Sequence, residues 1–414
     1  MKILWVKPGK LLPLDSGGKL RTYNILRHLS AAHGVTLLTY YSGPRDLLYE
    51  EEILKHFPGA IPLYTGVHAP VGFRRKLDYL LRLPDATPYA VSQFAAPCVR
   101  TMIARWMKQP CFDVVVCDFL ASTPNFPRDL AIPTVLFQHN VESVLWKRRA
   151  EFETRWFDRI VARIESFKMS LFEPAQVRRF HHVFAVSNED ARSMSLMTDS
   201  SHITVIPTGV DLSTFPYDPQ AEAKDPLVVF TGSMDWAPNI DAVEYFCKEI
   251  WPHVLNRVPE ARFRIVGRRP HPRVEMLASD SVEVTGSVPS TVGHLREAAV
   301  VAVPLRAGGG TRIKIYEGMA MGKAMVSTGI GAEGLDVHRG HDILIADEPG
   351  EFAESIISLL TNRQKRRNIE VAAANTAQKH DWSRVAAAFE AALHNIIQRQ
   401  PSRVAVPSEV PVKA

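Results

Sequence analysis

The segment of this chain that most clearly carries chemistry is Pro304–Thr328, which reads PLRAGGGTRIKIYEGMAMGKAMVST. An apolar strand end runs into three consecutive glycines, Gly308, Gly309 and Gly310, and then into a predicted helix. Glycine lets backbone amides approach a ligand closely, and the unpaired N–H groups of a helix start attract an anion. The segment is therefore suited to bind a phosphate.

Three charged side chains follow the glycine run. Arg312 and Lys314 place positive charge in the first helical turn, directly after Thr311, and Glu317 lies three residues beyond Lys314 on the same helix face. A carboxylate repels a phosphate, but it accepts hydrogen bonds from the vicinal hydroxyls of a ribose. Phosphate and diol together are groups of a nucleotide sugar. The alternative is a flexible loop that leads into a core helix, with the cations solvated and Glu317 paired with one of them.

A second pair of glycines lies near the start of the chain, in LDSGGKLRTYNILRHL. Gly17 and Gly18 stand just before a predicted helix, where their backbone amides would meet a phosphate from the opposite wall of a cleft. Lys19 lies in the first turn of that helix and faces either the donor or the acceptor. The alternative is an ordinary helix start that Ser16 caps.

The segment VLFQHNVES places His139, Asn140 and Glu142 directly after an apolar run. A lone histidine at a strand end is often structural, but this one stands at the predicted mouth of the cleft, beside an amide and a carboxylate. We therefore expect these three residues on the acceptor side of the site, with Ser143 capping the next helix.

The loop TGSMDWAPN joins a strand to a helix in the second half of the chain. Ser233 and Asp235 are positioned to face the cleft, and Ser233 is a candidate for donor binding. Trp236 and Pro238 would also suit a plain turn. The loop is therefore either a wall of the site or scaffolding.

Two similar halves position these residues. Short apolar runs alternate with segments of helical period, which is typical of parallel-sheet α/β proteins. The pattern breaks at Pro207–Asp225, and this predicts an N-terminal domain over residues 1–208 and a C-terminal domain over 209–379. Ligands of such sheets bind beyond the carboxyl ends of the strands. The predicted strands are Lys2–Val6, Val35–Tyr41, Val114–Cys117, Thr134–His139, Val183–Val186, Ile203–Ile206, Leu227–Thr231, Phe263–Val266, Val282–Val284, Val300–Val303, Ala324–Thr328 and Ile343–Ile345.

Several helices are also predicted from their period. Ser143–Arg179 reads as mostly one long helical stretch, and the tail over residues 400–414 is predicted to be disordered because it has three prolines and no periodicity. The remaining predicted helices are Lys19–Ala32, Glu351–Leu360, Gln364–Lys379 and Ser383–Ile397.

Composition limits the classes of function. The 414 residues carry a formal net charge of +5 with no Lys/Arg-dense arm, so nucleic acid is a poor partner. The N-terminus lacks a secretory apolar region, and no window approaches the roughly 20 apolar residues of a membrane-spanning helix. The four cysteines lack CxxC or metal-like spacing, so we expect reduced thiols in a cytoplasm and no metal site.

Taken together, these features resemble the retaining nucleotide-sugar glycosyltransferases of the GT-B fold, family four. The resemblance covers about residues 1–397. The order and spacing of several motifs together are more specific for the family than any single motif. The segments that carry it are SGGKLRTYNILRHL, HNVES, VSNED at Val186–Asp190, PTGVD in the hinge, FTGSMDWAPN, YEGMAMGKAMVST and HDWSRVAAAFEAAL.

The resemblance implies two Rossmann-like, doubly wound domains that face each other across a cleft. It implies that residues 380–397 form a strap helix that packs back on the N-terminal domain. Gly17 and Gly18 would then lie near the donor phosphates, His139 near the acceptor and the transferred sugar, and Glu317 at the ribose. Neither a cofactor nor a metal is required.

Two positions depart from the family pattern. The family commonly has a glutamate seven residues before the ribose glutamate, and this chain has Gly309 there. The family also usually has an arginine and a lysine in the loop that here reads SMDWAPN. Arg312 and Lys314 are expected to supply the missing cations. The departures keep two alternatives open: a non-catalytic nucleotide- or glycan-binding partner subunit of the same fold, and a nucleotide-sugar epimerase.

The expected reaction moves a sugar to an acceptor hydroxyl in polysaccharide or glycoconjugate synthesis. Arg312 and Lys314 would ease departure of the nucleotide, and His139 would orient groups rather than act as a base. Two basic and apolar segments, Gly72–Leu83 and Trp146–Phe172, bear on the acceptor. In the second, Ile160, Ile164, Phe167 and Leu171 form a stripe that the N-terminal core would normally bury. The alternative is a basic amphipathic surface on the anionic inner leaflet of a membrane, which would suit a lipid-linked glycan acceptor.

Overall fold

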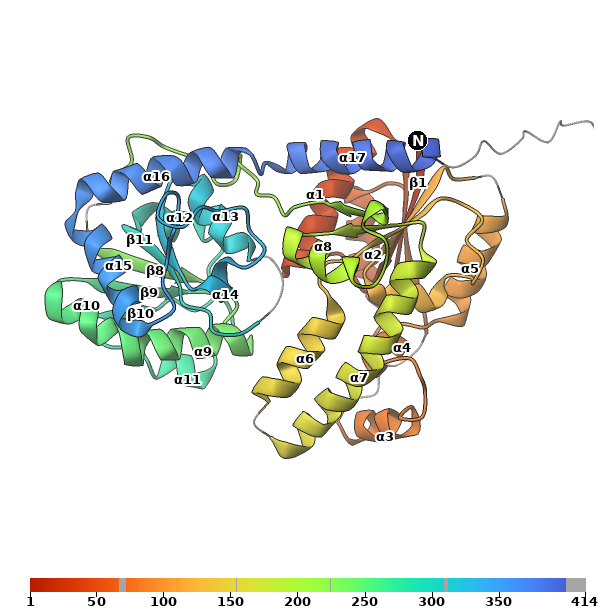
Figure 1. Ribbon diagram of the computed structural model, residues 1–414, viewed down its shortest axis with the longest axis horizontal. Coiled ribbons are helices and arrows are strands. Elements are labelled where there is room, and N and C mark those ends of the chain that lie inside the picture. The colour runs from red at the N-terminus through yellow and green to blue at the C-terminus, as the bar shows by residue number, and fades with distance from the viewer. Residues whose placement is uncertain (67–71, 110, 154, 224, 309–311, 400–414) are drawn as a thin grey trace, which may run out of the picture.

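The computed structural model of the protein describes residues 1–66, 72–109, 111–153, 155–223, 225–308 and 312–399 (Figure 1). Two parallel β-sheets, of seven and six strands, form the centres of two domains that lie side by side. The predicted doubly wound α/β class is therefore confirmed. The predicted disorder of residues 400–414 concerns residues outside the described ones.

The N-terminal sheet has the strand order β3-β2-β1-β4-β5-β6-β7. Its central strands are apolar on both faces because helices cover both. Ile3 and Trp5 of β1 belong to the core beneath α1 and α17, and Leu4 and Val6 belong to the core beneath α5 and α7. The strands are β1 (Lys2–Pro8), β2 (Gly34–Tyr41), β3 (Ala60–Tyr64), β4 (Val114–Asp118), β5 (Thr134–Phe137), β6 (His182–Ala185) and β7 (Ile203–Val205).

The C-terminal sheet has the order β10-β9-β8-β11-β12-β13. In both sheets the first strand of the domain lies in the middle, and the chain reverses its direction of winding beside it. Such a switch point opens a crevice at the carboxyl ends of the strands. The strands are β8 (Leu227–Thr231), β9 (Arg262–Val266), β10 (Val282–Val284), β11 (Val300–Val303), β12 (Ala324–Ser327) and β13 (Leu344–Ile345).

Helices connect the strands in each domain. Those of the N-terminal domain are α1 (Gly17–Ala32), α2 (Leu47–His56), α3 (Phe73–Leu81), α4 (Tyr89–Ser92), α5 (Pro97–Lys108), α6 (Glu142–Phe152), α7 (Trp156–Arg179) and α8 (Asn188–Ser195), with short 3₁₀ turns at Leu120–Asn125 and Ser200–His202. Those that follow are α9 (Ala237–Tyr245), a π-helical turn at Phe246–Ile250, α10 (Trp251–Arg257), α11 (Pro272–Glu275), α12 (Val292–Glu297), α13 (Ile313–Ala320), α14 (Gly329–Ala332), α15 (Pro349–Thr361), α16 (Arg363–Gln378) and α17 (Trp382–Arg399).

The prediction of one long helix over Ser143–Arg179 is wrong. The segment folds back on itself as the pair α6 and α7, which pack against each other and extend away from the sheet (Figure 1). Neither glycine nor proline lies at the break, so the sequence lacks the usual signal for a helix end. Tertiary packing of the two helices decides the turn.

The chain crosses between the domains twice, and the two crossings run side by side. The Val210 amide donates to the His380 carbonyl oxygen at 2.8 Å, and the Trp382 amide donates to the Val210 carbonyl oxygen at 3.2 Å. Gly209 lies so close to the Trp382 ring that an added Cβ would be 2.7 Å from it. From there α17 packs on the N-terminal domain, where Phe389 stacks on Trp5 with ring centroids 5.3 Å apart.

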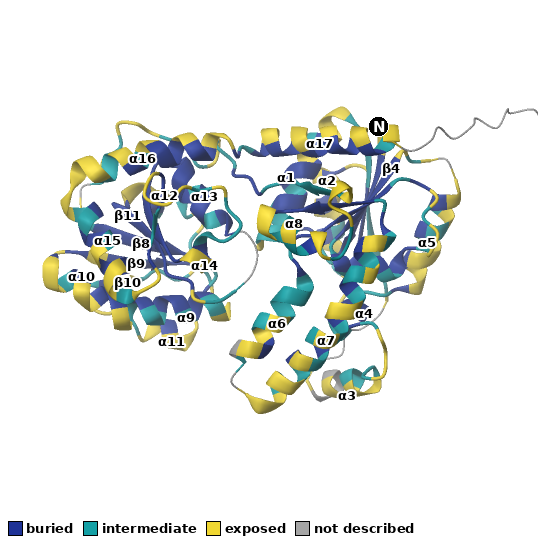
Figure 2. Ribbon diagram, viewed as in Figure 1, coloured by how far each residue is buried: buried dark blue, intermediate teal, exposed yellow. Residues whose placement is uncertain are grey.

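The apolar stripe of α7 is not buried as a core helix would be. Ile160, Phe167 and Leu171 are exposed, and Ile164 is half-buried. Figure 2 shows that exposed and half-buried residues dominate the lower parts of α6, α7 and α3, whereas the strands are buried. The expectation that the N-terminal core buries this stripe is therefore wrong.

Candidate functional site

The carboxyl ends of the two sheets face each other across the domain boundary. Arg268, which follows β9, donates to the carbonyl oxygen of Asp15, which follows β1, at 3.2 Å. Arg148 of α6 makes a two-pronged ion pair with Glu333, which follows α14, at 2.8 and 2.6 Å. Both contacts join segments beyond strand ends. The crevice predicted between the domains therefore lies where doubly wound sheets bind ligands.

His139 is buried at the end of β5 and both of its ring nitrogens are engaged. Arg21 donates to Nδ1 at 2.9 Å, because a guanidinium can only donate. Nε2 therefore carries the proton and donates to Asp118 at 2.6 Å. Asp118 also accepts from Thr22 at 2.7 Å and from the Trp5 indole at 3.1 Å. A network from three strands, β1, β4 and β5, and the helix α1 fixes the orientation of the ring.

Burial sets the charge states in this network. It lowers the pKa of His139 to about 4, against the opposing pull of Asp118 and with some help from Arg21. Burial alone would raise the pKa of Asp118, but its interactions with His139, Lys7 and Thr22 lower it overall. We therefore assign a neutral imidazole beside an ionised carboxylate. A neutral ring with both nitrogens occupied positions its neighbours and does not abstract a proton.

Gly18 has a packing role in addition to any role at a phosphate. A Cβ added there would lie 2.6 Å from Cζ of Phe119, closer than real side chains approach. Phe119 stacks flat on His139, with ring centroids 3.8 Å apart, and holds a left-handed φ of 66°. The start of α1 therefore fits over the ring that covers His139.

Gly17 and Gly18 are the first two residues of α1, so the helix begins two residues earlier than the predicted Lys19 start. Within the part of the chain that the structure describes, the Ser16 side chain makes no capping hydrogen bond, which counts against the alternative of a Ser16 cap. Lys19 forms an ion pair with Asp15 at 2.9 Å, and Arg268 lies 3.8 Å from the same carboxylate. Asp15 thus joins cations from both domains at the edge of the crevice.

Asn140 lines a cavity together with Arg312 and Glu333 of the C-terminal domain, and Glu142 is the first residue of α6. Burial, helped by the nearby Glu173 carboxylate, raises the pKa of Glu142 to about 7, while a hydrogen bond with Asn140 opposes the rise. The predicted cap by Ser143 is wrong. Glu173 of α7 accepts hydrogen bonds from the amides of Glu142 and Ser143 at 2.8 and 2.9 Å, and so caps α6 from outside.

Arg312 stands at the N-cap position of α13 and is buried. Its Nη2 donates to the carbonyl oxygen of Gly308 at 2.9 Å. Burial lowers its pKa to about 10, with Glu333 opposing and Arg148 adding to the shift. At neutral pH Arg312 remains a cation.

Lys314 follows on the same helix and is half-buried. Its Nζ donates to Asn239 Oδ1 at 3.1 Å and lies 4.2 Å from the centroid of the Phe230 ring. A Cβ added to Gly232 would be 2.8 Å from this Nζ, so the ammonium lies against the backbone at the end of β8. Burial, helped by Arg312 and opposed by Glu317, lowers its pKa to about 7.

Glu317 lies one turn further along α13 and is half-buried. Burial raises the pKa of its carboxyl to about 7, and the nearby Lys314 opposes that rise. The pKa values of Lys314 and Glu317 both lie near 7, so a charged ligand that binds near neutral pH would change the protonation of both groups. The structure thus places Arg312, Lys314 and Glu317 together, as the sequence predicted.

The Ser233 loop is anchored by a cation that the sequence analysis missed. Arg268 Nε donates to Ser233 Oγ at 2.8 Å, and Ser233 donates in turn to Asp235 at 2.6 Å. The signal was present in the sequence, because Gly267, Arg268 and Arg269 directly follow the strand β9. Arg268, from the segment that follows β9, therefore places a cation beside the Ser233 loop.

The glycine run is only partly described. Gly308 has a φ of +112°, and a Cβ added there would lie 3.0 Å from the Trp236 ring, so Trp236 shapes this turn. Gly309, Gly310 and Thr311 lie outside the described residues. A cavity of about 70 Å³ is lined by Asn140, Arg148, Asp190, Arg312 and Glu333, among others. Since a drug-sized ligand needs roughly 300–1,000 Å³, this cavity is one corner of the crevice.

Two family models match the chain. The model described as Glycosyltransferase Family 4 matches residues 16–214, and the model described as Glycosyl transferases group 1 matches residues 225–362. Together the matches cover both domains.

Relatives and solved structures agree with these matches. The chain is 26% identical over 344 residues to a phosphatidyl-myo-inositol mannosyltransferase of Mycolicibacterium smegmatis, covering 78% of this chain and 83% of the relative. It is 23% identical over 235 residues to a 44.6 kDa protein in the cps region of Klebsiella pneumoniae, covering 54% of this chain and 58% of that protein. Its fold is similar to that of Anabaena HepE in complex with UDP and glucose, with a TM-score of 0.65 and 15% identity over 95% of this chain and 99% of that one.

The structural similarity confirms the predicted GT-B architecture. Family matches over both domains exclude the alternative of a nucleotide-sugar epimerase, and they do not test the departures at Gly309 and in the Ser233 loop. The chain belongs to the family-4, group 1 glycosyltransferases, and it is an enzyme of sugar transfer.

Proposed function

We infer that this enzyme moves a sugar from a nucleoside-diphosphate sugar to an acceptor hydroxyl, with retained anomeric configuration, in the synthesis of a polysaccharide or glycoconjugate. The observation that carries the donor assignment is the pair of basic side chains, Arg312 and Lys314, at the start of α13 beside the crevice. The solved structure of HepE holds UDP and glucose, and the mycobacterial relative is a mannosyltransferase, which supports the same donor class.

Each part of such a donor has a matching group. Lys314, Arg312 and Arg268 supply positive charge for the diphosphate. Glu317 supplies a carboxylate for the ribose hydroxyls. The N–H groups at the start of α1, next to Gly17, offer a second anion contact from the opposite domain.

The chemistry follows from these charges. The bond between the sugar C1 and the phosphate oxygen breaks as C1 bonds to the acceptor oxygen, and the acceptor proton passes to the leaving phosphate. Fixed cations stabilise the negative charge that develops on the nucleotide, and they act strongly because the site is partly shielded from water. His139 stays neutral and positions the acceptor side, and no metal is required.

The test is turnover of a panel of UDP-, GDP-, ADP- and dTDP-sugars with lipid-linked and soluble glycan acceptors. We expect one donor to release free nucleotide and its nucleoside diphosphate to raise the melting temperature, because a ligand that binds only the folded state stabilises it. Nucleotide binding with no sugar transfer to any acceptor would contradict the proposal and favour a non-catalytic role.

The acceptor side of the enzyme is suited to a membrane surface. The Trp156 and Phe167 side chains are 74% and 67% exposed on α7, and Leu81 is 72% exposed at the end of α3. Lys168 Nζ of α7 donates to the carbonyl oxygen of Arg82 at 3.4 Å, so the two helices are neighbours. We call this surface the hairpin patch; its exposed apolar members are Leu77, Leu80, Leu81, Trp156, Phe157, Ile160, Phe167 and Leu171.

The excess of basic residues around the hairpin patch indicates the kind of surface that it would contact. Residues 142–179 contain nine Lys and Arg against six Asp and Glu. Large apolar side chains among basic residues match an anionic lipid surface, and in the described residues no helix is long and apolar enough to span a bilayer. The proposal is therefore peripheral contact with an anionic leaflet, where a lipid-linked acceptor would reach the crevice.

A further inference from the structure

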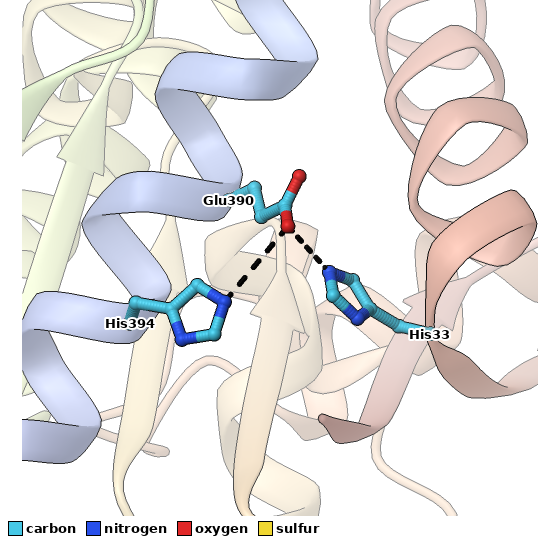
Figure 3. A group of neighbouring side chains, drawn as sticks. All are labelled: His33, Glu390 and His394. Carbon is cyan, nitrogen blue, oxygen red and sulfur yellow. Dashed lines mark hydrogen bonds and ion pairs between the residues drawn. The ribbon is translucent and has the colours of Figure 1, made fainter.

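Three metal-ligating side chains meet where the strap helix α17 lies against the N-terminal domain, far from the residues that hold the donor (Figure 3). Glu390 and His394 are four residues apart on α17 and so share one helix face. His33 follows the last residue of α1. Its Nε2 lies 2.8 Å from Glu390 Oε1, and His394 Nε2 lies 3.8 Å from the same oxygen.

We propose that His33, Glu390 and His394 bind a divalent transition-metal ion, with Zn²⁺ as the best fit, and that this ion fastens α17 to the N-terminal domain. Two imidazole nitrogens and one carboxylate oxygen form a zinc donor set with a fourth position for water. Metal–ligand bonds of about 2.0–2.2 Å place tetrahedral ligand atoms roughly 3.3–3.5 Å apart. The three ligand atoms lie within 4.8 Å of one another, so small side-chain rotations close the site.

Packing holds the ligands close before an ion arrives. Phe389 and Leu393, the neighbours of Glu390 and His394 on α17, are fully buried in the N-terminal core. The His33 amide donates to the Leu29 carbonyl oxygen at 2.9 Å and so continues the backbone of α1. The helix α17 and the end of α1, which carry the three ligands, therefore cannot separate without exposing the N-terminal core.

The orientation of His33 selects the nitrogen that would bind the ion. The Met1 amino nitrogen lies 3.3 Å from His33 Nδ1, whereas Nε2 faces Glu390. The proposed metal ligand is therefore His33 Nε2.

The ion would be structural and not catalytic. The site lies beside Met1 and His33, at the amino end of β1 and the last turn of α1, whereas the donor crevice lies at the carboxyl ends of the strands. α17 is one of the two crossings between the domains. An ion here would fix the far end of that strap without touching the donor, so the proposal stands independently of the donor assignment.

The test uses the full-length, tag-free protein at pH 8 with Zn²⁺ or Co²⁺ alone. We expect one ion per chain by calorimetry, a visible Co²⁺ spectrum, and a melting temperature that rises with Zn²⁺ and falls back with chelator. His394→Asn and Glu390→Gln are expected to weaken binding at least tenfold while leaving the melting temperature in chelator unchanged, because both side chains are partly exposed. His253→Asn, at an exposed histidine of α10, is the matched control and keeps the response.

Two results would overturn the proposal. One is a wild-type protein that shows neither stoichiometric binding nor a Zn²⁺-dependent melting temperature. The other is a metal response that persists at full strength in both His394→Asn and Glu390→Gln.

Discussion

At the scale of single residues, the site depends on close packing as much as on charge. Gly18, Phe119 and His139 form a stack in which each member fixes the next. Sequence reasoning assigned Gly18 to a phosphate, and the structure adds a second reason for glycine at that position.

A double substitution distinguishes the packing role of Gly18 from its proposed role at a phosphate. Gly18→Ala places a methyl against Phe119, and we expect a loss of about 1–3 kcal/mol in the free energy of unfolding, as in other overpacked cores. In a chain that already carries Phe119→Ala there is no clash, so Gly18→Ala is expected to cost less stability there than in the wild-type chain. Denaturant unfolding measures both. Equal losses for Gly18→Ala with and without Phe119 would contradict the packing role.

Glu317 gives a second residue-scale prediction. Glu317→Gln keeps the shape but weakens hydrogen bonds to the ribose, and we expect nucleotide affinity to fall roughly 10–100-fold, the scale of a hydrogen bond to a charged group. The stability at pH 8 is not expected to fall. The pKa of Glu317 is raised to about 7, so its ionised form costs stability above that pH and glutamine removes the cost. Unchanged nucleotide affinity would contradict the ribose assignment.

The residues proposed to bind the donor were mostly predicted from the sequence, but the residues that hold His139 in place were not. Arg312, Lys314 and Glu317 are local in sequence, so helix period alone places them together. The partners of His139 are not local: Arg21 precedes it by 118 residues and Asp118 by 21. Only the strand order β1-β4-β5 brings them together.

At the scale of elements, strands were easier to predict than the turn between helices. Buried parallel strands are continuous apolar runs, and nearly all were predicted; β3, which contains Pro62 and lies at the sheet edge, was missed. The α6–α7 turn has no glycine or proline, so its position follows from packing. That turn exposes the hairpin patch.

The hairpin patch yields an element-scale prediction. Phe167→Ser with Leu171→Ser is expected to reduce co-sedimentation with vesicles of anionic phospholipid several-fold without lowering the melting temperature, because both side chains are already exposed. Leu196→Ser changes a leucine that is 89% exposed outside the patch, and serves as the control. Equal binding by the double variant and the wild type would contradict membrane contact through this patch.

At the scale of the whole molecule, ion pairs hold the two domains in register. Arg148→Ala removes the cross-domain pair with Glu333, and we expect kcat/KM to fall several-fold while the melting temperature barely changes. Both partners are partly exposed, and such pairs contribute roughly 0–1 kcal/mol. Arg306→Ala, which removes a similar two-pronged pair with Asp241 inside the C-terminal domain, controls for charge loss. A kcat/KM that falls equally in both variants would show that domain register is not involved.

In the proposed function, the donor diphosphate binds at Lys314. The pKa of this ammonium is lowered to about 7, so at pH 8 it is mostly neutral and must gain a proton when an anion binds. Glu317, also near 7, is then mostly ionised and contributes little.

The most direct measurement is calorimetry of UDP and GDP binding at pH 8 in buffers of different ionisation enthalpy. The account predicts uptake of most of one proton per nucleotide bound. Lys314→Arg, which stays charged, is predicted to bind without that uptake. Binding with no proton uptake in the wild-type protein, or with equal uptake in Lys314→Arg, would contradict the claim.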